Sequence, residues 1–257
     1  MFNLELENKV AVITGASDGL GRAAAERLAS EGAKVAICAR RKDRIEETAR
    51  EIEARTGGEV FAQAADVRKN TDVDAFIDSV VARFGGVDIL LNNAGTSAAA
   101  PFEDVDDDQW QADIELKLLA AVRMCRRVIP LMRERGGGRI VNITTVGGKA
   151  PEPKRLPTSV TRAAGINLTK SLAGEYASDN ILVNTICIGK VKSAQWERRA
   201  MDGNVDAVYA DMSRNIPLGR MGESEEFADL VAFLVSARAA YITGTAINFD
   251  GGLSAVV

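Results

Sequence analysis

The segment Lys9–Gly21, KVAVITGASDGLG, constrains the fold of this chain more than any other segment. Its apolar run, Val10–Ile13, leads into a glycine-rich stretch and then into a segment with helical spacing, Arg22–Glu31. This order predicts a strand, a tight turn and the start of a helix. Glycines let the backbone approach a pyrophosphate, and a helix N-terminus offers amide donors to it. The segment therefore predicts a dinucleotide site.

Short apolar runs alternate with helical patterns along the whole chain, with no Pro-rich or Gly-rich linker between them. This alternation predicts an α/β fold: one doubly wound parallel sheet of about seven strands, with helices on both faces. The expected strands are Val10–Ile13, Val35–Ala39, Val60–Ala64, Val87–Leu91, Arg139–Ile143, Ile181–Cys187 and Thr245–Phe249. The expected helices are Arg22–Glu31, Lys42–Arg55, Thr71–Phe84, Asp106–Arg135, Thr158–Ala177 and Ser224–Val235. We expect residues 1–257 to form one domain, with a mobile helical insert at about 193–215.

Composition excludes several classes of function. The net charge of −4 leaves no basic surplus for nucleic acid or an anionic membrane. No apolar segment resembles a signal peptide or a membrane span, which predicts a cytoplasmic protein. The chain has no histidine, so His-based triads and most zinc sites are excluded, and its three scattered cysteines suggest neither a disulfide framework nor a metal site. We therefore expect a small-molecule substrate and no metal.

Five motifs together resemble the short-chain dehydrogenase/reductase family. They are Thr14-Gly15 with Gly19 and Gly21, Asn92-Asn93-Ala94-Gly95, GRIVNIT at 138–144, LVN at 182–184, and TG…DGG at 243–252. The resemblance covers essentially the whole chain. It implies a Rossmann-type subunit that binds NAD or NADP, is a homotetramer or homodimer, and covers its substrate with the insert at 193–215.

The resemblance also implies which residues hold the cofactor. The glycine turn would bind the pyrophosphate and adenosine, and the end of the third strand would meet the adenine. The fourth strand's end would meet the ribose region, and the segment after the sixth strand would lie by the nicotinamide. The implied residues are Gly15, Ser17, Asp18, Gly19, Leu20, Gly21, Asp66, Val67, Asn93, Ala94, Gly95, Gly189, Val191 and Ser193.

The choice between NADP and NAD depends on the end of the second strand. Members that bind NAD tend to carry an aspartate where this chain has Ala39. Arg40 and Arg41 follow it, and arginine forks suit a phosphate. Asp18 argues the other way, because relatives that prefer NADP often carry a basic residue there. We favour NADP, with NAD as the alternative.

The catalytic positions depart from the family pattern of Ser, Tyr-x-x-x-Lys and Asn. Aligned on the flanking motifs, the serine position holds Thr145 and the tyrosine position holds Thr158. The lysine position holds Arg162, and the asparagine position holds Lys117. Thr145 can still donate a hydrogen bond to a carbonyl, and Arg162 can fork onto ribose hydroxyls. An aliphatic hydroxyl at 158 is a far weaker acid than a phenol.

Lys117 is a candidate replacement for the missing acid. It falls within a stripe of residues at helical spacing: Trp110, Ile114, Ala121, Cys125, Val128 and Met132. A buried lysine has a lowered pKa, which suits a general acid or base near neutral pH. The alternative is a slightly rotated helix that lets Lys117 reach solvent along its aliphatic stem.

The chain resembles one divergent branch of this family more closely than the family as a whole. Its members carry a lysine on the long helix, Thr-Thr or Thr-Ser at the serine position, a Lys-x-Pro loop and Ser-x-x-x-Arg. The chain matches these with Lys117, Thr144-Thr145, Lys149-Ala150-Pro151 and Thr158 to Arg162. Lys149 thereby becomes a further candidate, although a solvated loop lysine is the reading we favour.

Three functions fit these residues. The first is an NADP-linked oxidoreductase that interconverts carbonyl and alcohol with Lys117, Thr145, Thr158 and Arg162 as its catalytic residues. The second is a non-redox enzyme, such as a lyase or isomerase, on the same scaffold. The third is a catalytically silent subunit that keeps the cofactor. We rank the first highest, because the hydride comes from the nicotinamide and the proton donor can be replaced.

Overall fold

A computed structural model describes residues 3–193 and 204–257 of the chain. In these residues seven parallel strands form one sheet in the order β3-β2-β1-β4-β5-β6-β7. The strands are β1 (Val10–Thr14), β2 (Lys34–Ala39), β3 (Val60–Ala64), β4 (Ile89–Asn92), β5 (Gly138–Thr145), β6 (Ile181–Ile188) and β7 (Ala246–Phe249). The order reverses between β1 and β4, so ligands are expected beyond the carboxyl ends of these strands.

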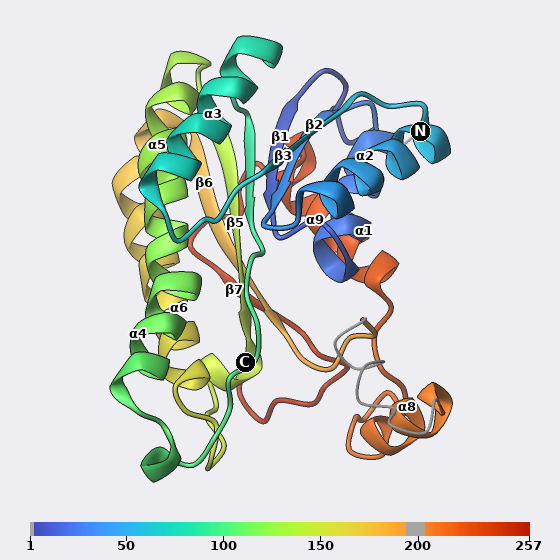
Figure 1. Ribbon diagram of the computed structural model, residues 1–257, viewed down its shortest axis with the longest axis vertical. Helices are drawn as coiled ribbons and strands as arrows, with labels where there is room; N and C mark the ends of the chain where they lie inside the picture. Colours follow the sequence, from blue (N-terminus) through green and yellow to red (C-terminus); the bar gives the residue numbers. More distant parts are fainter. Residues whose placement is uncertain (1–2, 194–203) are drawn as a thin grey trace.

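Helices cover both faces of the sheet, as predicted (Figure 1). On one face lie α1 (Gly19–Ser30), α2 (Lys42–Thr56) and α9 (Ser224–Val235). On the other lie α3 (Asn70–Phe84), α5 (Ala120–Glu134) and α6 (Thr158–Tyr176), with α4 (Asp107–Ile114) continuing beyond the sheet. Connections between consecutive parallel strands therefore run through helices, as the sequence pattern requires.

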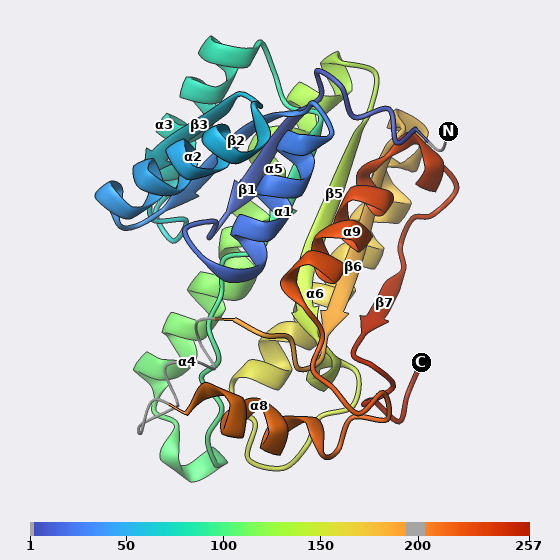
Figure 2. The same cartoon turned by 90° about the vertical axis from the view of Figure 1, so that its right-hand side faces the viewer.

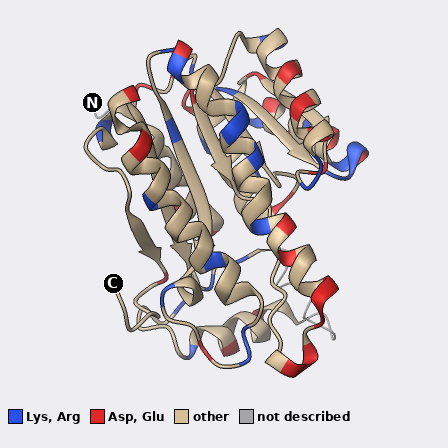
Figure 3. Ribbon diagram, turned by 90° about the vertical axis from the view of Figure 1, so that its left-hand side faces the viewer, with Lys and Arg blue, Asp and Glu red and all other residues tan. Residues whose placement is uncertain are grey.

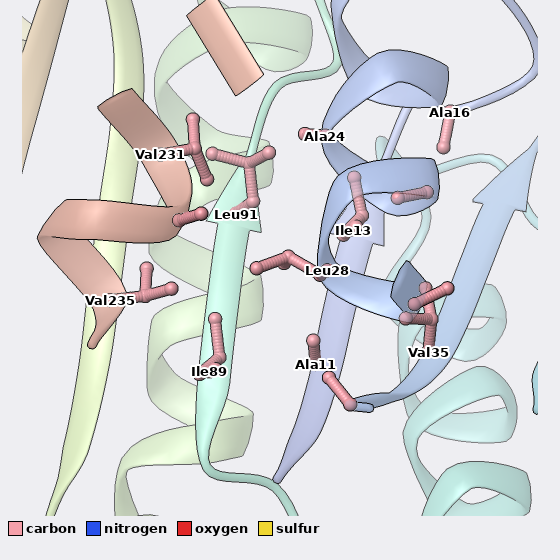
Figure 4. Packing of buried hydrophobic residues seen from close by; sticks show 14 of the residues in the cluster. Ala11, Ile13, Ala16, Ala24, Leu28, Val35, Ile89, Leu91, Val231 and Val235 are labelled. Atoms are coloured by element: carbon pink, nitrogen blue, oxygen red, sulfur yellow. The ribbon is translucent and has the colours of Figure 1, made fainter. Parts of the chain in front are cut away.

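Each face of the sheet has its own apolar core. In one of them, Leu28 of α1 points toward β4, which carries Leu91, and Val231 and Val235 of α9 lie on the other side of that strand in the view (Figure 4). β1 is buried along its whole length, which explains why its sequence is a continuous apolar run rather than an alternating one.

The helix predicted over Asp106–Arg135 is not uniformly α-helical. It begins at α4 with a capping box between Asp106 and Gln109, and then passes through a π-helical turn, Glu115–Leu119, into α5. A π-turn holds an extra residue, which changes the direction in which the preceding side chains point. Lys117 lies at the centre of this turn, so the departure from regular helix falls at a predicted site residue.

The insert predicted at about 193–215 falls partly outside the described residues, since 194–203 are not among them. Its later part forms α8 (Val205–Ser213), which lies below the carboxyl end of the sheet (Figure 2). The role of this insert as a substrate lid stays a prediction.

Lys, Arg, Asp and Glu residues are spread along the helices (Figure 3). Acidic residues gather where α4 begins, at Asp106, Asp107 and Asp108, and the positive end of the helix dipole favours them there. None of the described helices is both long and apolar enough to cross a membrane.

Candidate functional site

A cleft of about 660 Å³ lies beyond the carboxyl ends of the strands. Its lining includes residues from the ends of β1, β2, β3, β4, β5 and β6, which the sheet order brings together. Of the residues predicted to hold a cofactor, sixteen line it: Gly15, Ser17, Asp18, Gly19, Leu20, Arg40, Arg41, Asp66, Val67, Asn93, Ala94, Gly95, Arg162, Gly189, Val191 and Ser193. The fold therefore gathers nearly the whole predicted set at one site.

The glycine turn is built to let a ligand approach the start of α1. Gly15 and Gly19 both have positive φ values, 67° and 57°, which favour glycine. The N-cap residue of α1, Asp18, makes no side-chain cap hydrogen bond, so the first amides of the helix are not used by a capping side chain. These amides and the helix dipole fit the pyrophosphate of a dinucleotide.

The turn is fixed against the end of β4. Thr14 Oγ1 accepts hydrogen bonds from the backbone amides of Asn93 and Ala94, both at 3.1 Å. Asn93 Nδ2 in turn donates to the carbonyl oxygens of Thr14 and Gly15, both at 3.0 Å. The asparagine motif therefore holds the glycine turn in place, a role that the sequence analysis did not assign to it.

Gly21 differs from the other predicted cofactor residues, because it does not line the cleft. A Cβ atom built on it would meet Asn93 Nδ2 at 2.5 Å and the Gly15 carbonyl oxygen at 2.6 Å. Direct contact between Gly21 and the cofactor stays a prediction. The small size of Gly21 lets α1 pack tightly behind the turn.

Replacement of Gly21 by alanine is expected to destabilise the protein by about 1–3 kcal/mol, because the new methyl group overpacks a backbone contact. Thermal unfolding would show a melting temperature several degrees lower. Gly174→Ala is the matched control: Gly174 lies within α6 and nothing lies within 4 Å of its Cβ position. We expect this control to be neutral or slightly stabilising. Equal melting temperatures for the two variants would contradict the packing argument.

Arginines surround the far end of the cleft, next to Ala39. Arg40 and Arg41 line it, as predicted. Arg41 Nη2 lies 3.1 Å from Asp18 Oδ2, and Arg44 Nη2 lies 3.0 Å from Asp18 Oδ1. The carboxylate that argued against NADP is thus paired with two guanidinium groups, and its charge is offset. Arg44 was not predicted, because it lies in the first turn of α2 and no motif marks it.

Asp66, predicted to meet the adenine, forms a bidentate pair with Arg68 across distances of 2.6–3.1 Å. The hydrogen bonds from Arg68 lower the pKa of Asp66 to about 2. The carboxylate is therefore ionised at every physiological pH and is held by its own loop at the edge of the cleft.

Lys117 is buried: only 6% of its surface is exposed, so it does not reach solvent along its stem. Its ammonium Nζ donates to Asp113 Oδ1 and, at 2.7 Å, to Thr158 Oγ1. Burial lowers the pKa of Lys117 to about 8, while the hydrogen bond that Lys117 donates to Asp113 raises it and the charge of Arg162 lowers it further. At neutral pH the group is charged but loses its proton easily.

Thr158 connects Lys117 to the cleft. Lys117 does not line the nucleotide cleft, whereas Thr158 does, together with Thr145. Thr158 Oγ1 accepts from Lys117 and, at 3.1 Å, from the Ala98 amide, which leaves its own proton free to be donated elsewhere. No hydrogen bond within residues 3–193 and 204–257 uses the Thr145 hydroxyl, which leaves it available to a substrate.

Arg162 lies between the cleft and the protein interior. Its Nη1 donates to the Ile143 carbonyl oxygen at 2.6 Å, and burial lowers its pKa to about 10. A Cβ atom on Gly95 would meet Arg162 Nη2 at 2.6 Å, so the glycine makes room for the guanidinium. Its buried Nε has no partner among the described residues.

A second cavity, of about 20 Å³, lies behind the cleft beside Lys117 and Arg162. Asn92, Asn142 and Thr161 are among the polar residues that line it. A space of this size and polarity accommodates one water molecule.

Lys149 is not a solvated loop lysine, so that expectation is wrong. Its Nζ donates to the Ala246 carbonyl oxygen and, at 2.7 Å, to Asn248 Oδ1. Both acceptors belong to β7, so Lys149 fastens the loop after β5 to the edge strand. It does not line the nucleotide cleft and serves the fold rather than the site.

Sequence reasoning missed Asp113, which is 4% exposed and faces the site from α4. Its Oδ2 accepts from Thr161 Oγ1 at 2.6 Å. A signal for it was present, since Asp113 and Lys117 stand four residues apart on a helix, the spacing of an ion pair.

Among the described residues, no group of three or more Cys, Asp or Glu is placed to hold a metal ion.

Comparison with known proteins adds independent findings. Residues 15–254 match the family described as enoyl-(acyl carrier protein) reductase. A 3-oxoacyl-acyl-carrier-protein reductase from Staphylococcus epidermidis is 38% identical over 247 residues, covering 96% of this chain and 99% of its own length.

Two solved structures also resemble the chain. L-sorbose reductase from Gluconobacter frateurii, in complex with NADPH and L-sorbose, is 37% identical with a TM-score of 0.95, and the match covers 100% of both chains. An NADPH-bound short-chain oxidoreductase from Pseudomonas aeruginosa PAO1, described as containing an atypical catalytic center, is 36% identical with a TM-score of 0.93. That match covers 97% of this chain and 98% of the other.

Proposed function

The chain belongs to the short-chain dehydrogenase/reductase family and is an NAD(P)-dependent oxidoreductase, and from this premise we propose that it interconverts a carbonyl and an alcohol with NADPH and a proton donor built from Lys117 and Thr158. The single observation that carries the proposal is the 2.7 Å hydrogen bond between Lys117 Nζ and Thr158 Oγ1. It links a buried ammonium to a hydroxyl that lines the nucleotide cleft. The reductase relatives favour this function over a non-redox enzyme or a silent subunit.

NADP fits the residues of the cleft. The glycine turn and the start of α1 would hold the pyrophosphate, and Arg40 and Arg41 would meet the 2′-phosphate. Arg162 Nη2, close to Gly95, would reach the nicotinamide ribose, while Gly189, Val191 and Ser193 would lie by the carboxamide. Two of the similar structures contain NADPH, which supports the same cofactor here. When bound, NADPH supplies the hydride.

The chain's own residues would supply the proton. Thr145 donates a hydrogen bond to the substrate carbonyl oxygen and polarises it. Thr158 Oγ1 donates its proton to that oxygen as negative charge develops there, and Lys117 Nζ replaces the proton on Thr158 in the same step. The aliphatic hydroxyl therefore never has to carry a full negative charge, and the net proton donor is the Lys117 ammonium.

A substrate screen tests the function. Purified protein would be mixed with NADPH and a panel of ketones, keto sugars and β-ketoacyl thioesters, and NADPH consumption would be followed by absorbance. We expect turnover with at least one carbonyl class. Tight binding of NADPH without turnover of any of them, and without oxidation of the corresponding alcohols by NADP, would contradict the proposal.

A homotetrameric assembly and a cytoplasmic location stay predictions of the sequence. Gel filtration tests the predicted assembly.

Thr158→Val is expected to lower kcat by about 100-fold or more, because valine keeps the shape of threonine but cannot pass a proton. The dissociation constant of NADPH is expected to stay within a few-fold, since Thr158 contacts the proton path rather than the phosphates. Thr158→Ser is the matched control, because it keeps the hydroxyl and should retain most of the rate. If the serine variant loses as much activity as the valine variant, the hydroxyl is not the relay.

A further inference from the structure

Asp113 holds a position that no motif assigns. Its carboxylate is buried between two helices, with one oxygen accepting from Lys117 Nζ and the other from Thr161 Oγ1 at 2.6 Å. Thr161 lies on α6, one turn from Thr158, so the carboxylate connects the proton donor to the helix that carries the relay hydroxyl. The four side chains form one hydrogen-bonded chain, which runs from Thr158 through Lys117 and Asp113 to Thr161.

We propose that Asp113 is a positioning residue, which holds the Lys117 ammonium against the Thr158 hydroxyl and is itself oriented by Thr161. The inference rests on the proposed function, in which Lys117 supplies the proton. A lysine side chain has a flexible four-carbon stem and no preferred direction of its own. The Asp113 carboxylate and the Thr158 hydroxyl both accept hydrogen bonds from Lys117 Nζ, so together they fix the direction of the ammonium group.

Asp113 also controls the charge of Lys117. The charged groups that face Lys117 in the described residues are Asp113 from α4 and Arg162 from α6. Asp113 raises the pKa of Lys117, whereas Arg162 and burial lower it. Without the carboxylate, the lowering effects act alone, and the ammonium form would be lost at lower pH. Reduction requires the ammonium form. As the pH is raised, the rate of reduction would therefore begin to fall at a lower pH than in the native protein.

Three variants separate the two roles of Asp113. Asp113→Asn keeps the shape and one acceptor oxygen but removes the charge. Thr161→Val keeps the charge but removes the hydrogen bond that orients the carboxylate. Asp88→Asn is the matched control, because Asp88 is also buried and paired, to Arg135 and the Val10 amide, but lies outside the site.

The first measurement needs no substrate. The protein would be labelled with ¹³C at lysine Cε, and the Lys117 signal, assigned by its loss in Lys117→Met, would be titrated by NMR without cofactor. We expect a midpoint near 8 in the native protein and one lower by about one pH unit or more in Asp113→Asn. The Thr161→Val and Asp88→Asn midpoints should stay near the native value.

The second measurement is the pH profile of kcat for carbonyl reduction. The falling limb should move to lower pH in Asp113→Asn by the same amount as the NMR midpoint. Thr161→Val should keep the limb in place but lower kcat by about tenfold, because a misdirected donor transfers its proton less often. KM should change little in either variant, since neither side chain lines the nucleotide cleft.

The outcomes distinguish this inference from the proposed function. An unchanged NMR midpoint in folded Asp113→Asn, together with full activity of Thr161→Val, would overturn the role of Asp113. If Asp113→Asn does not fold, a native kcat in Thr161→Val alone overturns it. A shifted midpoint supports the inference even if Lys117→Met retains native turnover, a result that would overturn the proposed proton donor instead.

Discussion

Lys117→Met is expected to lower kcat for carbonyl reduction by about 100- to 10,000-fold, the range that general acids contribute. Methionine fills a similar volume but has no proton to give, so Thr158 would lose its only protein-derived supply in the relay we propose. The affinity for NADPH should stay within a few-fold, because Lys117 is separated from the cleft by Thr158. Stopped-flow measurement of the hydride-transfer step, beside NADPH binding by fluorescence, checks both statements.

The single variant also leaves the buried Asp113 without its cation, and such an unpaired charge destabilises a protein by several kcal/mol. The double variant Asp113→Asn, Lys117→Met removes both charges and separates this effect from catalysis. We expect it to regain stability while kcat remains low. Lys170→Met, on the exposed part of α6, should match the native protein in rate. Recovery of activity in the double variant would show that Lys117 stabilises the fold rather than supplying the proton.

Ala39→Asp is expected to reverse the cofactor preference. The new carboxylate would stand at the end of β2, where it repels a 2′-phosphate and can accept hydrogen bonds from the ribose hydroxyls of NAD. We expect the NADPH dissociation constant to rise by roughly 30-fold, equivalent to about 2 kcal/mol, and NADH to bind more tightly than before. Isothermal titration calorimetry with both cofactors measures the change directly.

Ala39→Ser provides the control for side-chain size, because it adds a polar group without charge. This variant should keep the native preference. If Ala39→Asp binds NADPH as tightly as the native protein, the 2′-phosphate does not lie beside Ala39, Arg40 and Arg41. In that case Asp18, with its paired Arg41 and Arg44, would not form the phosphate end of the cleft either.

Much of the fold could be predicted from local patterns. The strand at Val60–Ala64 and the helix at Ser224–Val235 have the same bounds in the structure as in the prediction. Both are bounded by turn-forming or capping residues, so their ends are marked in the sequence itself. The long helix was predicted as regular, because apolar spacing alone does not reveal a local change from α to π hydrogen bonding.

Some residues of the site could likewise be predicted from the sequence, and others could not. The cleft residues could be predicted because they follow strand ends, and parallel strands bring their carboxyl ends to one edge. The burial of Lys117 followed from its place on an apolar stripe. The contact between Asp113 and Thr161 could not be predicted in this way. Their pairing spans 48 positions in the sequence and depends on how α6 packs against α4.

The π-turn at Glu115–Leu119 has a consequence for how this chain can change in length. Deleting one residue there would restore a regular helix and rotate α4 by about 100° relative to α5. Asp113 would then point away from Thr161, while every residue of α5 kept its place in the core. A change of length in this turn would therefore alter the position of Asp113 in the site without altering the hydrophobic pattern of α5.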